Sequence, residues 1–225
     1  MVVVHGGGWS TGDKAELAWM LNGLKQRGFG VAKINYRFTL NAPDNYKMQL
    51  ADVDSAVQFS LRQAAAQTFN SQTNYIVGHS AGAHLFLCYA YSRNANGKVR
   101  AAGSMAGPTN LFGMAYYAST IYNSKLQPFL GFPLYPITVP TEQRNKSCSP
   151  QYQAPGSSTP SIFFHGESDF FIRSDQSTIL AYTLGGPGVD NKVIIYPATF
   201  HDWWGDVVSV NNTLNELKTW FAGHN

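Results

Sequence analysis

The sequence predicts an α/β fold, in which a mostly parallel β-sheet carries helices on both faces. Short apolar runs alternate along the 225 residues with longer segments whose apolar residues recur at helical spacing. In addition, the residues capable of chemistry follow directly after predicted strands, where active residues of parallel sheets gather. The length fits a single domain, or one domain with an insertion, and suffices for a sizeable core.

Six apolar runs predict the strands of this sheet. The run formed by residues 1–4 is β-branched and uninterrupted, as expected of a buried strand. The predicted strands are residues 1–4, 30–36, 74–77, 99–105, 161–165 and 192–196.

The segments between and after these runs predict helices. In residues 13–28, the side chains of Leu17, Leu21 and Leu24 share one face, and Gly28 supplies a helix stop. The predicted helices are residues 13–28, 48–66, 83–91, 175–184 and 206–221, with loops at 38–46 and 197–204.

Residues 108–159 interrupt the alternation and are too long for a simple connection. This segment holds several aromatic residues, among them Phe112, Tyr116, Tyr117, Tyr122, Phe129, Phe132 and Tyr135. We expect one domain over residues 1–225, in which 108–159 is an insertion that covers the site as a cap or lines its pocket. The alternative is that this segment packs against the rest of the domain as a structural insertion and has no role in binding substrate.

Composition narrows the class of protein. Charged residues are 13% and the net charge is +3, without a run of Lys or Arg, so nucleic-acid binding is not expected. No apolar run approaches the length of a membrane span. Cys88 and Cys148 make no disulfide framework, although a bond between them stays open. The first residues lack the basic region of a signal peptide, so a cytoplasmic location is the default expectation.

The stretch Gly78-His79-Ser80-Ala81-Gly82 lies between a predicted strand and a predicted helix. This is the context of a nucleophile elbow, in which a serine lies on a sharp turn with a strained backbone. Side chains at the two glycine positions would collide with neighbouring backbone. We therefore predict that Ser80 is a nucleophile, with a serine in an unreactive tight turn as the alternative.

A serine hydroxyl is a weak nucleophile, so it needs a base and an oxyanion site. The stretch His5-Gly6-Gly7-Gly8-Trp9 follows the first strand, and its glycines allow backbone N–H groups to converge on one spot. The amides of Gly7, Gly8 and Ala81, the residue after the nucleophile, are the predicted oxyanion donors. A flexible glycine turn is the alternative for this loop.

The base must be a histidine that reaches Ser80. The six histidines are His5, His79, His84, His165, His201 and His224. His201 follows the last predicted strand on a loop, so it is free to lean over Ser80 and is the predicted base. We expect the others to pack, to brace a local turn or to lie at the frayed terminus.

A carboxylate must hold the base in its correct tautomer and stabilise the imidazolium. Asp169 follows the fifth strand and is the predicted acid, with Glu167 as the reserve. The other carboxylates considered are Asp175, Asp202 and Asp206. Asp202 is adjacent to His201 in sequence, so we expect its carboxylate to be solvated rather than aligned with the imidazole of His201.

Together these residues resemble the α/β-hydrolase superfamily, in which nucleophile, acid and histidine come in this order. Within it, they are similar to the esterase/lipase group around hormone-sensitive lipase, above all to its feruloyl esterase, acetylxylan esterase and kynurenine formamidase-like branch. The residues that carry the resemblance are His5-Gly6-Gly7-Gly8-Trp9, Gly12-Asp13-Lys14, Asn35-Tyr36-Arg37, Asp52, residues 78–85, His165-Gly166 with Asp169, and His201. It covers nearly the whole chain except residues 108–159, and it says little about substrate.

The chain departs from the resemblance at its start. In that fold, two or more strands precede the one that leads into the His-Gly-Gly-Gly loop, whereas this chain starts inside it. By analogy, residues 1–4 would lie in mid-sheet and residues 30–36 would form an apolar edge, which invites pairing. We expect either a truncated gene product or a homodimer that covers this edge, and a missing start would leave a secreted location open.

These parts predict a serine carboxylic-ester hydrolase for small-molecule esters, without a metal or an organic cofactor. The aromatic insertion suggests a pocket for a small apolar or aromatic acyl or alcohol group, and the resemblance implies carbohydrate-linked acetyl or feruloyl esters. The resemblance also implies an alternative, an arylformamidase-like amide hydrolase. A further alternative is a catalytically silent α/β-hydrolase binding scaffold.

Overall fold

The computed structural model describes residues 1–39, 45–113, 120–130, 139–154 and 159–225. Within these residues it contains one β-sheet of six strands. Their bounds are β1 Val2–Val4, β2 Ala32–Ile34, β3 Asn74–His79, β4 Val99–Met105, β5 Ser161–Gly166 and β6 Asn191–Tyr196. The strand order is β2-β1-β3-β4-β5-β6, and every neighbouring pair is parallel. The predicted α/β class is confirmed, with β1 inside the described sheet and β2 at its edge.

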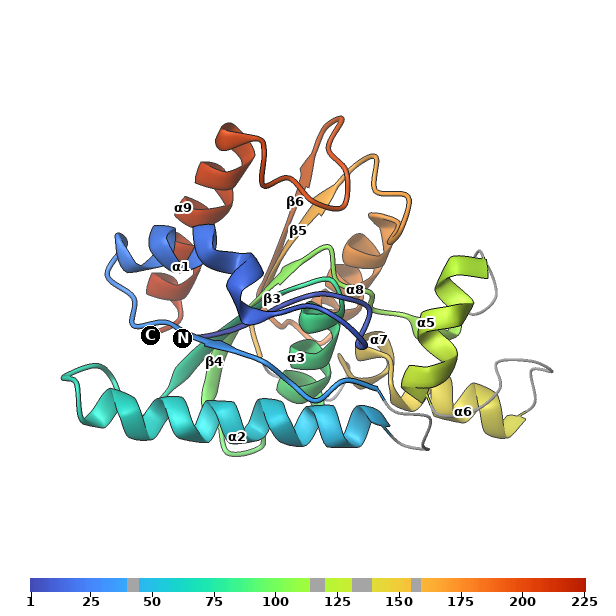
Figure 1. Ribbon diagram of the computed structural model, residues 1–225, viewed down its shortest axis with the longest axis horizontal. Coiled ribbons are helices and arrows are strands. Elements are labelled where there is room, and N and C mark those ends of the chain that lie inside the picture. Colours follow the sequence, from blue (N-terminus) through green and yellow to red (C-terminus); the bar gives the residue numbers. More distant parts are fainter. Residues whose placement is uncertain (40–44, 114–119, 131–138, 155–158) are drawn as a thin grey trace.

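Helices cover both faces of this sheet (Figure 1). On one face, α1 (Ala18–Lys25) lies beside α9 (Val207–Gly223). The other face carries α2 (Asn45–Ala65), α3 (Ala81–Ser92) and α8 (Asp175–Gly185).

The core consists of two apolar clusters, one on each face of the sheet. Successive side chains of a strand point to opposite faces. Val2 and Val4 accordingly join the cluster under α2, α3 and α8, whereas Val3 joins the cluster under α1 and α9. Burial on both faces explains why the run at residues 1–4 is apolar without alternation.

Several element bounds differ from the predicted ones. Residues 13–28 divide into a 3₁₀ helix, η1 (Lys14–Leu17), followed by α1, and Asp13 caps η1 in a capping box with Glu16. Helix α3 begins at Ala81, directly after the elbow serine, and α2 begins at Asn45 in a stretch predicted to be a loop. The polar residues that open α2 hide its start from an argument based on apolar spacing.

Among the described residues of the insertion are helices α5 (Thr120–Leu130), α6 (Val139–Ser147) and α7 (Pro150–Gln153). Leu126, Phe129 and Leu130 are buried in the cluster that α2 and α3 share. Of the predicted aromatic group, Tyr116, Tyr117, Phe132, Tyr135 and the side chain of Tyr122 lie outside the described residues. The described part of the insertion therefore packs onto the main core.

The two cysteines are free and buried, and the thiol of Cys88 lies 3.4 Å from the carbonyl oxygen of Cys148. Along the described parts of the chain, no helix combines the length and the apolar character needed to cross a membrane.

Candidate active site

Ser80 occupies a sharp turn between β3 and α3. Its φ of 51° is unusual for a residue that has a Cβ and marks local strain. A Cβ at Gly82 would lie 2.3 Å from the carbonyl oxygen of His5, and one at Gly78 would lie 2.8 Å from the amide nitrogen of Ala83. These close approaches to backbone confirm the expected reason for a glycine on either side of Ser80.

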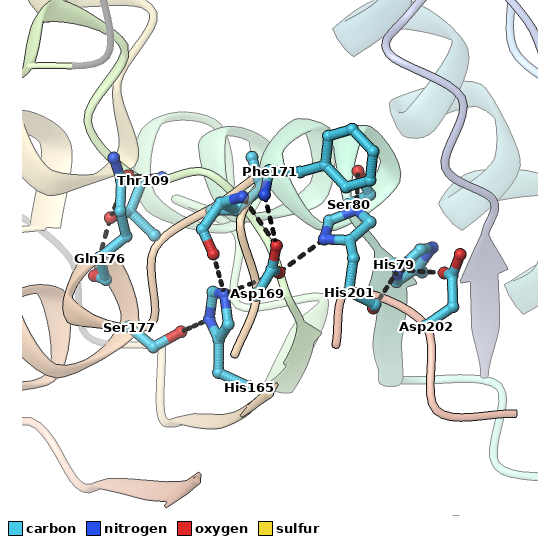
Figure 2. A network of polar contacts seen from close by, with 11 residues as sticks. His79, Ser80, Thr109, His165, Asp169, Phe171, Gln176, Ser177, His201 and Asp202 are labelled. Atoms are coloured by element: carbon cyan, nitrogen blue, oxygen red, sulfur yellow. Dashed lines mark hydrogen bonds and ion pairs between the residues drawn. The ribbon is translucent and has the colours of Figure 1, made fainter. Parts of the chain in front are cut away.

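Ser80, His201 and Asp169 form one chain of hydrogen bonds (Figure 2). The Nε2 atom of His201 lies 2.9 Å from Oγ of Ser80, and its Nδ1 lies 2.6 Å from Oδ2 of Asp169. The three side chains come from the ends of β3, β6 and β5, so the structure brings together the three residues selected from sequence. Because a carboxylate only accepts, Nδ1 carries the proton and Nε2 is left to accept from the serine.

The carboxylate of Asp169 is buried and fully engaged. Its Oδ1 accepts hydrogen bonds of 2.9 Å from the amides of Phe171 and Ile172, and its Oδ2 also lies 3.3 Å from Nε2 of His165. Burial alone would raise the pKa of Asp169, but the hydrogen bonds from His165 and His201 outweigh it and hold the pKa well below its usual range. The carboxylate is therefore ionised at neutral pH.

His165 fixes this acid from the side away from His201. Its Nδ1 lies 2.8 Å from Oγ of Ser177, and its Nε2 lies 2.8 Å from the carbonyl oxygen of Ile172. Because a carbonyl only accepts, Nε2 carries the hydrogen and also points it toward Asp169. The sequence predicted that His165 orients the following turn, but it did not reveal the direct contact with the acid; the spacing of four residues was the available signal.

The glycine loop after β1 has a left-handed backbone. The φ angles of Gly7, Gly8 and Trp9 are 101°, 55° and 61°, and a Cβ at Gly7 would lie 2.1 Å from the carbonyl oxygen of Thr11. Within the described residues, the amides of Gly7 and Gly8 have no hydrogen-bond acceptor. The amide of Ala81 opens α3 and so has no intrahelical acceptor either.

Aromatic side chains hold this loop in place. The buried indole of Trp9 donates to Nδ1 of His84 at 3.2 Å and stacks on Phe129 of the insertion, with ring centroids 4.4 Å apart. His5 stacks on Tyr36, whose hydroxyl donates to a carbonyl oxygen of the loop at 2.9 Å. The expectation that His5 braces the loop is confirmed, and the contact between the loop and the insertion is a feature that the sequence did not show.

His79 supports the predicted base through its backbone. Its Nε2 lies 3.2 Å from the carbonyl oxygen of His201 and 3.2 Å from Oδ1 of Asp202. Burial, followed by the nearby charge of His201, lowers the pKa of His79 to about 3, so its ring is neutral and Nε2 donates. Asp202 thus pairs with His79, as Figure 2 shows, and does not contact the imidazole of His201.

The remaining candidates from the sequence lie elsewhere. Glu167, the reserve acid, is exposed, and its carboxylate accepts from the amide of Ala198 at 3.3 Å. Asp175 pairs with Arg173, and Asp206 caps the first turn of α9. Asp169 is therefore the predicted carboxylate that the structure brings to His201.

A cavity of about 310 Å³ opens at Ser80. Its lining residues are Gly6, Gly7, Gly8, Trp9, Glu16, His79, Ser80, Ala81, Pro108, Lys125, Phe171, His201 and Asp202. Lys125 comes from α5, where its side chain covers Gly8 and its Nζ donates to Oγ of Ser10 at 3.0 Å. The insertion therefore supplies part of the pocket wall, and the three amides predicted as oxyanion donors border the same space as the serine.

Two further kinds of site were considered in the part of the chain that the structure describes, a metal site and a second cavity. No group of three or more His, Cys, Asp or Glu residues is arranged to hold a metal ion among these residues. A second cavity, of about 290 Å³, lies beside the start of β2 and contains none of the site residues selected from sequence.

Sequence comparison relates the chain to esterases. A family model described as BD-FAE matches residues 1–184. A probable isoprenylcysteine alpha-carbonyl methylesterase of Arabidopsis thaliana is 25% identical over 221 residues, which cover 88% of this chain and 44% of the relative. A similarly named protein of Oryza sativa subsp. japonica is 26% identical over 223 residues, covering 88% and 49%. The chain thus spans about half the length of these curated relatives.

Solved structures show the same fold. The native esterase Est2 of the planctomycete Thermogutta terrifontis superposes with a TM-score of 0.77 at 20% identity, covering 99% of this chain and 80% of that one. A truncated carbohydrate esterase from gut microbiota gives a TM-score of 0.80 at 18% identity, covering 99% and 84%. The sheet and its helical layers are thus those of the α/β-hydrolase fold.

Proposed function

Since the chain belongs to the BD-FAE family of α/β-hydrolase esterases, we propose that it is a serine carboxylic-ester hydrolase for small acyl or aryl esters. The observation that carries this proposal is the continuous hydrogen-bond chain from Ser80 through His201 to Asp169. A strained turn presents the serine, and the backbone amides of the glycine loop border the same cavity.

The first half of the proposed reaction forms an acyl-enzyme. Ser80 Oγ attacks the ester carbonyl carbon while Nε2 of His201 takes its proton, and Asp169 stabilises the imidazolium that results. The carbonyl oxygen becomes negatively charged and accepts hydrogen bonds from the amides of Gly7, Gly8 and Ala81. Each such donor typically accounts for about 100- to 1,000-fold in rate.

The second half releases both products. His201 passes its proton to the oxygen of the leaving alcohol, and the bond between that oxygen and the carbonyl carbon breaks. A water molecule then attacks the acyl-enzyme, with His201 again taking the proton, and the acid leaves as the hydroxyl of Ser80 is restored.

The size of the cavity supports small substrates. Ligand pockets commonly enclose about 300–1,000 Å³, so a cavity of about 310 Å³ is at the lower end of that range. Methylesterases and a carbohydrate esterase among the similar proteins favour ester substrates, whereas a similar puromycin-hydrolyzing peptidase of Mycobacterium tuberculosis keeps amide hydrolysis as the alternative. We therefore propose small esters, among them carbohydrate-linked acetyl or feruloyl esters, as the substrate class.

The decisive test replaces the nucleophile. We expect Ser80→Ala to abolish hydrolysis of p-nitrophenyl acetate and labelling by a fluorophosphonate probe, with an unchanged melting temperature. Ser55→Ala is the matched control, because Ser55 lies on the exposed face of α2 and bonds only its own helix. Hydrolysis of N-formylkynurenine in place of the ester would favour the arylformamidase alternative, and an unlabelled wild-type protein would favour the silent scaffold.

We also propose that a homodimer covers the edge strand β2. Within the described residues, β2 pairs on one side only, with β1, and its residues are half-buried. The unpaired backbone groups of such an edge are a template for another strand. Light scattering coupled to size-exclusion chromatography should give the mass of a dimer, and a monomer at micromolar concentration would contradict this proposal.

A further inference from the structure

Three exposed phenylalanines form an apolar surface that reaches the cavity through Phe171. The exposed fractions of Phe170, Phe171 and Phe200 are 72%, 43% and 57%. The ring centroids of Phe170 and Phe171 are 4.3 Å apart, and Phe170 meets Phe200 edge-on at 6.4 Å. We call these three side chains the phenylalanine platform. Contiguous exposed apolar surface of this kind is typical of binding sites.

The phenylalanine platform is attached directly to the residues that carry the proposed chemistry. Phe170 and Phe171 directly follow Asp169, and Phe200 directly precedes His201. The amide of Phe171 donates to Oδ1 of the same carboxylate that holds His201. The ring of Phe171 lines the cavity and meets the imidazole of His201 edge-on at 5.5 Å, as Figure 2 shows.

The direction of proton transfer decides which part of an ester lies there. His201 must protonate the leaving oxygen, so that oxygen lies within hydrogen-bond reach of its Nε2. The carbonyl oxygen points instead toward the amides of Gly7, Gly8 and Ala81. The alcohol part of the ester therefore begins beside the ring of His201, where Phe171 forms the adjacent wall.

On the basis of the proposed function, we infer that the phenylalanine platform binds the alcohol part of the substrate and selects an alcohol with a flat apolar ring face. Phe171 contacts the ring that follows the leaving oxygen, and Phe170 and Phe200 extend the contact outward. An aryl ring and the CH face of a sugar share this chemistry. Rigid aromatic side chains lose little conformational freedom on binding, which favours their use as stacking surfaces.

A matrix of four esters tests the inference. The four esters combine an acetyl or a benzoyl group with ethanol or benzyl alcohol. Because these two alcohols have similar acidity, the aromatic ring of the alcohol is varied while its quality as a leaving group stays nearly constant. The variants are Phe171→Ala and the double variant Phe170→Ala/Phe200→Ala. Tyr182→Ala on α8 is the matched control, because this aromatic side chain is 86% exposed and lies outside the cavity lining.

The measured quantity is the ratio of kcat/KM for benzyl acetate to that for ethyl acetate. We expect this ratio to fall about tenfold in each phenylalanine variant, as removal of a stacked ring predicts, and to stay at its wild-type value in Tyr182→Ala. A parallel fall for an acetylated methyl glucoside would extend the site to sugar rings, whereas a fall confined to benzyl acetate would restrict it to aryl alcohols.

Two results would overturn the inference and leave the proposed function intact. One is an unchanged benzyl-to-ethyl ratio in the phenylalanine variants. The other is a loss that follows the benzoyl group, which would move the platform to the acyl side. A wild-type protein that cleaves none of the four esters would instead contradict the proposed function, and the inference would fall with it.

Discussion

Replacing Asp169 with asparagine separates the charge of this side chain from its shape. In the structure, Oδ1 accepts from the amides of Phe171 and Ile172, so the amide oxygen of an asparagine must take that place. Its NH₂ group then faces Nδ1 of His201 and Nε2 of His165.

This orientation forces the wrong tautomer on the base. An NH₂ group donates, so Nδ1 of His201 would have to accept, and its proton would move to Nε2, which could no longer accept from Ser80. The equivalent change in an unrelated serine hydrolase lowers kcat about 10⁴-fold. Rotating the amide restores the acceptor to His201 but leaves the amides of Phe171 and Ile172 unsatisfied, at about 1–3 kcal/mol each. The two unsatisfied amides together cost about 2 kcal/mol or more, so at most roughly one molecule in 30 adopts this rotated amide.

We therefore expect Asp169→Asn to lower kcat for p-nitrophenyl acetate by at least about 30-fold and by up to about 10⁴-fold. Steady-state kinetics measure the loss, and thermal unfolding checks that the variant is folded. Glu167→Gln is the matched control, because Glu167 is exposed and accepts from the amide of Ala198, and it should stay close to the wild-type rate. A near-normal Asp169→Asn together with an inactive Glu167→Gln would refute the assignment of the acid.

Three further outcomes are expected. Burial lowers the pKa of His79 to about 3 and that of His84 to about 4, so the unfolded chain binds more protons and the folded protein loses stability as pH falls. Urea unfolding should therefore show a loss of about 2 kcal/mol in the free energy of unfolding from pH 6 to pH 5. A free energy of unfolding that does not change between these pH values would contradict this. Gly82→Ala should destabilise by about 3 kcal/mol or more in thermal unfolding, whereas Gly223→Ala, with open space around it, should not. His79→Phe cannot donate to the carbonyl of His201, and the loss of about 1 kcal/mol of positioning should lower kcat about tenfold with little change in KM. An unchanged kcat in steady-state kinetics would refute the positioning role of His79.

The order of elements and the predicted triad were accessible from the sequence for one physical reason. In a parallel sheet, the carboxyl ends of all strands meet at one edge, so residues that directly follow different strands become neighbours. Ser80, Asp169 and His201 each follow a strand by a few residues, and the structure places them in hydrogen-bond contact. Element bounds were less accessible, since the polar start of α2 and the capped 3₁₀ turn before α1 carry no apolar periodicity.

The walls of the site were not accessible in the same way. Lys125 reaches Ser10 across 115 residues of chain, and Phe129 stacks on Trp9 only because α5 packs beside α2. The contact between His79 and the backbone of His201 likewise joins the end of β3 to the loop after β6, and the path of that loop depends on everything packed around it. No local pattern encodes which face of a helix turns toward a distant loop.

The sequence by itself thus determined the fold class, the elbow and the identity of the three hydrogen-bonded residues, because these depend on local backbone constraints and on the order of strands. Only the tertiary structure decided what surrounds them. It placed the side chain of Lys125 from α5 over Gly8, set His165 and two backbone amides around the acid, and left three phenylalanines exposed next to Asp169 and His201 in the chain. These features arise from the packing of elements against each other, which is a property of the whole chain.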